Sequence, residues 1–403
     1  MRTLAAFCAG SLWLAAQPQA PPGALPPELD LLTRIRLHML EQLQRQPNYT
    51  CVETVERSRR AGATRKFQLQ DTLRLEVALV DGKEMFAWPG SRNFEDTDLR
   101  NMVTTGAIGN GNFALHARSI FEGRTATFEY RGKWPLEDRP SVRFDFRVPL
   151  MLSGYHIRVS EKEAVVGYHG SFYAEPESLD IQRIELLADD IPLELGLSEA
   201  GDRIDYARTH IGESEFLLPA SSELVMVDLN GQESRNHVRF TGCRQFTGES
   251  VLSFGDPPAE DAPAATPLQD IELPVRLGLT LSLLDEIDTS AAAVGDPVRA
   301  RLENDLKQKG HVLMSKGAVA VGRITRLERW ADYTVLGLEF FMLESAGVRA
   351  RIQASLESIG TMDQIRPRQR DLGSSHVRPG EGIVPLRAGR IRLSRGILMF
   401  WRT

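Results

Sequence analysis

The sequence is poor in cysteine and lacks the motifs of the common enzyme classes. Its 403 residues include three cysteines, and no C-x-x-C pair occurs, so neither a thioredoxin-like redox motif nor a cysteine-rich zinc site is expected. The metalloprotease motif H-E-x-x-H, the hydrolase motif G-x-S-x-G, the phosphate-binding Walker loop and the dinucleotide fingerprint are also absent. A net charge of −6 gives no indication of a nucleic-acid partner.

Long apolar runs are equally scarce. The one extended run, Leu4–Ala16, follows Arg2 and precedes small residues up to Ala20, which is the order of a secretory signal peptide with cleavage near Ala16 or Ala20. The run is shorter than the about 20 residues that a membrane-spanning helix needs. We therefore expect a periplasmic or secreted protein, the alternative being an uncut N-terminal anchor.

In an exported protein, the cysteines that remain after cleavage can form a disulfide. With Cys8 removed, Cys51 and Cys243 are left, an even number in an oxidising compartment, so we expect a disulfide between them. Closing so long a loop would stabilise the fold by roughly 5 kcal/mol in the chain-entropy model. The alternative is a pair of buried free thiols. In a simple meander the first and last strands lie at opposite edges, so a bridge requires a strongly curled sheet or a tail folded back.

Prolines and composition divide the chain. Between Gly255 and Asp270 large apolar residues are nearly absent and prolines recur, as in a semi-rigid linker. The predicted organisation is a signal peptide over 1–20, a Pro-rich spacer over 21–27, a helix plus curved antiparallel sheet over 28–254, a Pro/Ala linker over 255–270, and a C-terminal β-rich domain with a basic tail over 271–403.

Hydrophobic periodicity indicates a mainly β protein with a few helices. Apolar residues recur at helical spacing over 28–46, between prolines that end or begin a helix. Patterns typical of strands fill 52–88 and 125–240, with hairpin signals at Asp81-Gly82 and Asn230-Gly231. Helical patterns over 98–105 and 113–121 flank a glycine-rich joint. We expect an open, curved antiparallel sheet packed on helices, and a smaller C-terminal β-barrel-like domain.

This element order resembles the periplasmic lipoprotein-carrier fold, in which helices fill the concave side of an unclosed sheet. The resemblance covers about 210 residues and implies an apolar ligand such as a lipid or a lipoprotein. Three phrases are also similar to those of uncharacterised secreted bacterial proteins: Asn48-Tyr49-Thr50-Cys51, Gly106-Ala-Ile-Gly-Asn-Gly111 and Gly242-Cys243-Arg244.

The second unit faintly resembles the barrel domain of the channel scaffold of type IV secretion and conjugation systems, over about 60 residues. It departs from that pattern at Met314-Ser315, so the resemblance is used for the fold alone. The phrases behind it are Gly278 to Leu284, Ile287-Asp288-Thr289, Val294-Gly295-Asp296, Lys316-Gly317-Ala318 and Gly322-Arg323-Ile324.

A curved sheet that does not close must cover its inner face with helices or leave a cavity, and apolar cavities bind apolar ligands. The candidate lining residues are Leu32, Ile35, Met39, Phe113, Leu115, Ile120 and Phe121; the alternative is that they form ordinary core. No cofactor is expected, and the eight histidines show no metal-ligand spacing.

The C-terminal tail is the one strongly charged segment. Nine arginines against two acidic residues give residues 366–403 a local net charge of +7. Arg387, Arg390, Arg392 and Arg395 are candidates for contact with anionic lipid or an acidic envelope protein, the alternative being a solvated face. We expect a non-enzymatic binding protein for a lipid or other apolar group. An envelope scaffold and a hydrolase with an unrecognised site are the alternatives.

Overall fold

The computed structural model describes residues 25–60, 66–91, 94, 113, 115–123, 125–159, 162–246, 269–345, 347–360 and 378–403. The expected signal peptide, the helical segment 98–105, the glycine-rich joint and most of the expected linker lie outside the described residues. In the part that is described, no helix is long and apolar enough to cross a membrane.

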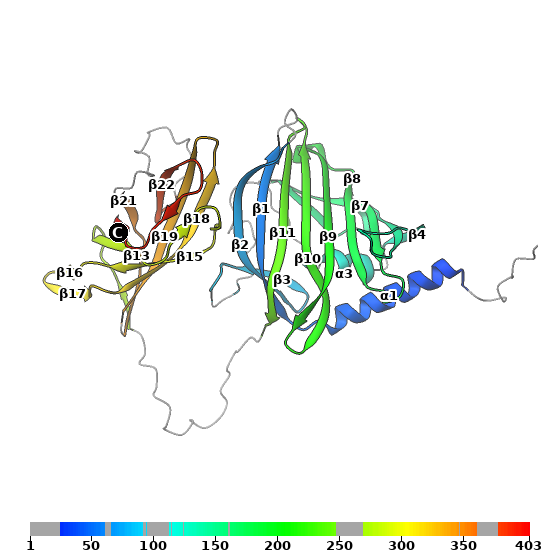
Figure 1. Cartoon of the computed structure of the whole chain (residues 1–403), viewed down its shortest axis with the longest axis horizontal. Coiled ribbons are helices and arrows are strands. Elements are labelled where there is room, and N and C mark those ends of the chain that lie inside the picture. Colours follow the sequence, from blue (N-terminus) through cyan, green and yellow to red (C-terminus); the bar gives the residue numbers. More distant parts are fainter. Residues whose placement is uncertain are drawn as a thin grey trace, which may run out of the picture.

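Eleven strands of the first unit form one antiparallel sheet, drawn in blue to green in Figure 1. Their order across the sheet is β3-β2-β1-β11-β10-β9-β8-β7-β5-β4, with β6 paired to β7. The strands are β1 (Tyr49–Arg60), β2 (Gln68–Val80), β3 (Lys83–Ala87), β4 (Thr127–Lys133), β5 (Val142–Val148), β6 (Tyr155–Val159), β7 (Lys162–Ala174), β8 (Ile181–Asp189), β9 (Leu197–Ile211), β10 (Ser214–Asp228) and β11 (Glu233–Gln245).

The first and last strands of this sheet are neighbours. Val55 of β1 lies opposite Leu73 of β2 on one side and Val238 of β11 on the other. The expectation that a meander places β1 and β11 at opposite edges is therefore wrong, because the edges are β3 and β4. After β3 the chain crosses to the far edge and returns strand by strand. Pairing with β11 then satisfies the second row of β1 backbone groups.

Two helices cover the concave side. Helix α1 (Pro27–Arg45) begins with Pro27, whose missing N–H is not needed in the first turn, and it ends before Pro47. Helix α3 (Leu115–Phe121) is a short second cover, and in Figure 1 it lies behind β9. Hydrophobic alternation predicts two short strands over 215–218 and 223–228, whereas the structure joins both in one strand, β10. Its register shifts between Pro219 and Ser221, where proline has no N–H for the ladder.

The second unit is a nine-stranded mixed sheet with two small two-stranded sheets. Its strand order is β12-β20-β19-β18-β15-β13-β24-β21, with β22 paired to β19. The strands are β12 (Gln269–Glu272), β13 (Gly278–Leu283), β14 (Ile287–Asp288), β15 (Pro297–Leu302), β16 (Leu306–Gln308), β17 (His311–Met314), β18 (Val319–Arg329), β19 (Tyr333–Ser345), β20 (Val348–Arg351), β21 (Ser355–Ile359), β22 (Glu381–Arg387), β23 (Arg392–Leu393) and β24 (Leu398–Arg402).

The second unit contacts the first at the part of β2 that β3 does not reach. Leu73 forms a parallel bridge with Val294. The amide of Val294 donates to the Thr72 carbonyl, and the amide of Arg74 donates to the Val294 carbonyl, both at 2.8 Å. One cluster of buried apolar side chains runs through this contact from the first sheet into the second.

Candidate binding site on the concave face

The concave face carries an aromatic cluster that α1 and α3 cover. Phe172 of β7 stacks on Phe144 of β5 with ring centroids 5.2 Å apart, and the Phe121 ring of α3 meets it edge-on at 5.3 Å. The other buried members are Ile35, Met39, Leu43, Ala117, Ile120, Val142, Phe146, Val148, Tyr168, Ala174, Ile181, Ile184, Leu186, Ile204, Tyr206 and Leu217. The described concave face is thus filled rather than open over these strands.

The candidate lining residues divide into groups. The cluster contains Ile35, Met39, Ile120 and Phe121 as buried members, and Leu32 packs against it from its edge. Phe113 lies in the other core cluster, with its ring 5.0 Å from Tyr49 and 5.0 Å from Phe240. Leu115, the first residue of α3, is 38% exposed. A ligand-lining role for these residues stays a prediction.

A buried polar pair lies beside this apolar cluster. The imidazole Nε2 of His116 is 3.7 Å from Oδ2 of Asp202, and both side chains are buried. Burial lowers the pKa of His116 to about 4 and raises the pKa of Asp202 to about 7. The Tyr155 ring meets the His116 ring edge-on at 5.2 Å. Burial therefore favours the neutral form of both groups in this polar pair.

Further ionisable groups extend this pair across the concave side. Burial, reinforced by the nearby Glu84, raises the pKa of Glu53 to about 8. Glu84 also raises the pKa of Tyr49 and of Tyr206, although burial is the larger cause in both. The nearby Asp202 also raises the pKa of Tyr206. These residues form one group that runs from β1 and β3 to β9 and α3, which we call the polar row: Glu53, Glu84, Tyr49, Tyr206, Asp202 and His116.

Three atoms of the polar row have no hydrogen-bond partner. They are the Tyr49 hydroxyl, Oε2 of Glu53 and Oδ1 of Asp202, all shielded from solvent. Such atoms are uncommon in native proteins, where an unpaired buried polar group costs about 1–3 kcal/mol. Other described residues also carry such atoms, for example Trp401 at Nε1, so the polar row stands out by having three of them.

Sequence reasoning missed the polar row, although part of the signal was present. Alternation along β1 places Glu53 on the same side as Tyr49, Cys51 and Val55, all of which are buried. An acidic residue in an inward position is the feature that could have been recognised. Asp202 was harder to find, because the pattern predicts a strand from 203 and the structure begins β9 at Leu197.

The polar row does not form the arrangement of a serine hydrolase. Ser119 of α3 shares a 2.7 Å hydrogen bond with the Tyr168 hydroxyl. Among the described residues no hydrogen bond joins a serine to His116, and no group of three or more histidine, cysteine, aspartate or glutamate residues suits a metal ion. Acyl transfer needs the missing nucleophile–base contact.

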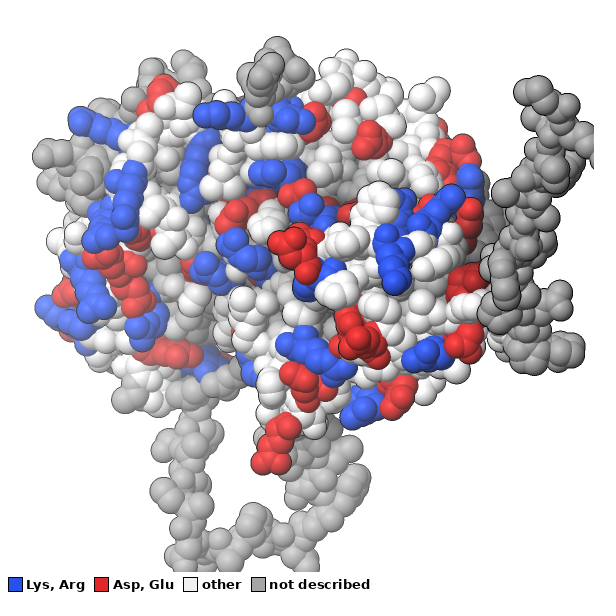
Figure 2. Space-filling model, turned by 45° about the vertical axis from the view of Figure 1, so that its right-hand side comes forward, with Lys and Arg blue, Asp and Glu red and all other residues white. Residues whose placement is uncertain are grey.

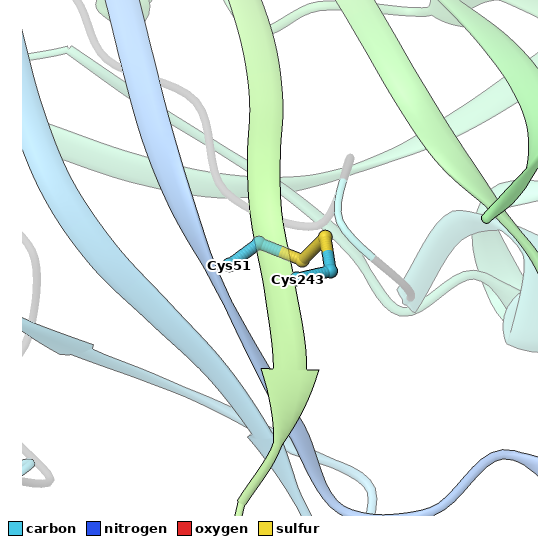
Figure 3. Close-up of a disulfide and its surroundings, with 2 residues drawn as sticks. All are labelled: Cys51 and Cys243. Atoms are coloured by element: carbon cyan, nitrogen blue, oxygen red, sulfur yellow. A yellow bond between two sulfur atoms is a disulfide. The ribbon is translucent and has the colours of Figure 1, made fainter. Parts of the chain in front are cut away.

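The disulfide joins β1 directly to β11 (Figure 3). Cys51 and Cys243 have Cα atoms 4.1 Å apart and a sequence separation of 192. They lie where the register of the two strands shifts, between Thr50 and Val52. Neighbouring strands thus bring the cysteines together, which needs neither a tail folded back nor contact between the sheet edges. An oxidised pair fits an exported protein.

The opposite face of the sheet is polar and grooved. A groove of about 920 Å³ crosses β4 to β10, and Figure 2 shows acidic and basic side chains interleaved over the surface. The charges are paired locally: Asp145 accepts from Arg131 and Arg143 at 2.6 and 2.8 Å, and Asp189 contacts His169 at 2.6 Å. Asp145 and Asp189 thus each contact a basic side chain, whereas Glu53 and Asp202 of the polar row are buried carboxyl groups with raised pKa values.

The four candidate arginines of the tail are exposed, and two of the four are already paired. Arg390 and Arg392 both contact Asp288, at 2.6 and 3.2 Å, and the hydrogen bond from Arg390 holds the pKa of Asp288 far below its usual range. Arg387 and Arg395 are exposed at the same end of the chain. A contact with lipid or protein stays a prediction for all four.

Comparison with known proteins finds distant structural likenesses. No family model matches the sequence, and no curated protein matches it. The structure is similar to a domain assigned to outer membrane lipoprotein sorting from Vibrio parahaemolyticus, with 10% identity, a TM-score of 0.31, and coverage of 53% of this chain and 92% of that one. It is also similar to a DUF1329 family protein from Desulfovibrio piger, with 8% identity, a TM-score of 0.30, and coverage of 54% and 94%. No ligand follows from likenesses this distant.

Proposed function

We propose that this protein is an exported, non-enzymatic binding protein that holds a lipid or another apolar group between the concave face and helices α1 and α3. One observation carries the proposal: the apolar cluster under α3 lies beside Asp202, whose Oδ1 is shielded from solvent and has no hydrogen-bond partner. An apolar chain would replace contacts that Ile120 and Phe121 make with the sheet. A polar end that donates a hydrogen bond would reach Oδ1 of Asp202.

The proposal also draws on the size of the covering elements. Helix α3 has seven residues, too few for a stable helix by itself, so its position depends on packing against the sheet. Displacing it would expose an apolar surface ready to receive a ligand. The disulfide and the expected signal peptide support export, where such a carrier would meet lipid.

Native mass spectrometry of the purified full chain, followed by lipid extraction, tests the proposal. We expect bound or exchangeable lipid. Ala117→Leu, on the buried side of α3, should reduce uptake because the larger side chain occupies the space of the ligand. Ala320→Leu is the matched control: it overpacks an equally buried site in the second unit, with a similar cost of about 1–3 kcal/mol. A wild-type chain without bound lipid or uptake overturns the proposal.

A second candidate function is contact with the membrane surface of the cell envelope. The 3-10 turns η1 (Leu150–Leu152) and η2 (Leu193–Leu195) both adjoin β7, and together they expose large aliphatic side chains. Met151 is 91% exposed and Leu193 is 77% exposed. Protruding apolar tips of this kind suit insertion at the head-group boundary.

Co-sedimentation with vesicles separates this candidate from a purely soluble carrier. The double variant Met151→Glu and Leu193→Glu should lose binding, whereas Val275→Glu, at a site of 80% exposure in the second unit, should keep it. Tail charges are tested with Arg387→Glu and Arg395→Glu. Truncation is unsuitable, because β24 lies inside the second sheet between β13 and β21. Equal sedimentation of all variants rejects membrane contact through η1 and η2.

A further inference from the structure

We propose that a second copy of this chain docks at the outer edge of β4, where the two β4 strands pair antiparallel about a two-fold axis at Tyr130. The inference goes beyond the proposed function, because it concerns a protein partner rather than a ligand. Two features of the same edge support it: a strand without an outer neighbour, and a helix that extends further than the sheet it covers.

Strand β4 ends the first sheet. Its inner side pairs with β5 along residues 127–133, and within the described part of the chain no strand pairs with its outer side. Such an outer row of backbone N–H and C=O groups is a template for another strand, which is why edge strands are often very short or covered. Here β4 has seven residues and Tyr130 is 38% exposed. The edge is therefore open to pairing.

Helix α1 reaches beyond this edge. At its C-terminal end the Gln46 side chain donates to the Leu217 carbonyl of β10 at 3.3 Å, and further back the Arg36 guanidinium lies 5.2 Å from the Phe128 ring of β4. The helix has nine more residues before Arg36, about 13 Å, which exceeds two strand spacings of about 4.8 Å. Figure 1 shows it running past β4. Residues 25–30 are all exposed, with Leu29 at 44%, so α1 offers an apolar cover for a further strand.

The side chains of β4 favour a second β4 as that strand. In an antiparallel pair centred on Tyr130, Glu129 lies opposite Arg131 of the second copy, and the reverse pair repeats across the axis. Their side chains are 66% and 46% exposed and contact each other at 2.9 Å within one chain, so the pair would join four charges of alternating sign. Opposite charges directly across two strands are favourable. A bulge between Tyr130 and Gly132 disfavours unrelated strands, which leaves the choice of partner to this complementarity.

The two copies of α1 also fit in this arrangement. Helix α1 crosses β4 near Phe128, two residues from the axis, so the helix of the second copy crosses two residues beyond the axis on the other side. Four residues along a strand span about 14 Å, whereas packed helices lie about 8–10 Å apart. The helices can therefore pass each other, and the exposed first turns of each would lie under the sheet of the other copy.

Cross-linking of the full oxidised chain tests the pairing directly. Residues opposite each other in antiparallel strands have Cα atoms about 4.5–5.5 Å apart, which a disulfide can span. Tyr130→Cys should therefore give a covalent dimer on a non-reducing gel. Trp134→Cys is the matched control: Trp134 is 49% exposed, but it lies four residues from the axis and roughly 27 Å from its copy, so it should stay uncross-linked.

Charge reversal tests the register by analytical ultracentrifugation. We expect the wild-type chain to dimerise, and Glu129→Arg or Arg131→Glu alone to weaken the dimer at least about tenfold, because each places like charges across the axis. An equal mixture of these two variants should dimerise like wild type, since each supplies the charge that the other lacks. Glu199→Arg, an exposed reversal on the interior strand β9, is the control and should leave the dimer intact.

A wild-type chain that stays monomeric and gives no Tyr130→Cys cross-link overturns the inference, whether or not the chain binds lipid. A dimer that survives both single reversals, or that the mixture fails to restore, also overturns it, because another surface then holds the copies together. If the charge variants do not fold, the cross-links at positions 130 and 134 decide the matter.

Discussion

Leu73 and Val294 pair in parallel across the boundary between the two sheets, and the next residue, Gly295, fits there only because it has no side chain. A Cβ atom at position 295 would lie 2.3 Å from the Arg74 carbonyl oxygen and 2.6 Å from the Trp88 ring. Its φ of +100° is also a conformation that glycine adopts readily and other residues do not. The junction therefore depends on this glycine.

Gly295→Ala should weaken the junction as well as strain the backbone. Gly389→Ala is the matched control, since Gly389 has a φ of +106° with open space around its Cβ position. Strain alone should cost each variant about 1–2 kcal/mol, and crowding should cost Gly295→Ala a further 1–3 kcal/mol, roughly. Urea unfolding measures the difference. Equal losses of unfolding free energy in the two variants would show that Arg74 and Trp88 do not crowd position 295.

The disulfide should be a major contributor to stability. Reducing Cys51–Cys243 opens a loop of 192 residues, which in the chain-entropy model lowers the free energy of unfolding by about 5 kcal/mol. Urea midpoints with and without reductant measure the effect. The double variant Cys51→Ser and Cys243→Ser should match the reduced protein and should not respond to reductant. Coincident midpoints for oxidised and reduced protein would contradict this prediction.

Glu53 should make the protein less stable as the pH rises. Its pKa is raised from 4.5 to about 8 in the folded chain, so the folded form keeps a proton that the unfolded form releases. The stabilisation is present below about pH 4.5 and is lost as the pH rises through about 8. Glu53→Gln removes this loss and should be more stable than wild type at about pH 8, by roughly 1–3 kcal/mol.

The comparison with Glu53→Gln is needed because His116 acts in the opposite direction. Its pKa is lowered from 6.5 to about 4, so it adds stability as the pH rises through that window. Glu56→Gln, on the other face of the same strand, should leave the pH profile unchanged. Parallel pH profiles for wild type and Glu53→Gln would mean that Glu53 titrates normally.

Asp71 should be costly to replace. Its carboxylate accepts from Nε of Arg57 at 2.7 Å, and both residues are buried. Asp71→Asn removes the negative charge that this buried guanidinium contacts, so we expect a loss of about 3–5 kcal/mol in the free energy of unfolding, measured by heat or urea. Asp285→Asn removes the partner of the exposed Arg299 and should cost less than about 1 kcal/mol. Similar losses in the two variants would show that burial of the first pair is incomplete.

Local pattern was enough to recognise most elements. Alternation predicts strands over 142–148 and 297–302, which are the bounds of β5 and β15 in the structure. Prolines place the first helix over 28–46, within one residue of α1 at each end. The mainly β fold with an open curved sheet followed from the number and spacing of such patterns. What pattern could not give is which strands pair, because β1 has the same alternation whether its neighbour is β11 or solvent.

The candidate site was predicted in part for the same reason. Ile35, Met39, Ile120 and Phe121 meet because each lies on the apolar side of a helix, which periodicity reveals. The encounter of Glu53 with Glu84 depends on β2 pairing between β1 and β3, and that of His116 with Asp202 depends on where α3 packs against the sheet. Neither strand pairing nor helix docking can be read from a short sequence window.

The pairing of β1 with β11 also sets an order of events during synthesis. A chain emerging from its N-terminus delivers β1, β2 and β3 long before residue 233, where β11 begins. Until then one edge of β1 is unpaired, and Cys51 has no disulfide partner, because Cys243 lies 192 residues further along the chain. Contacts this distant in sequence form slowly, and open strand edges invite association with other chains. The species most prone to association with other chains is therefore the nascent protein that still lacks β11. A holding chaperone would have to protect it.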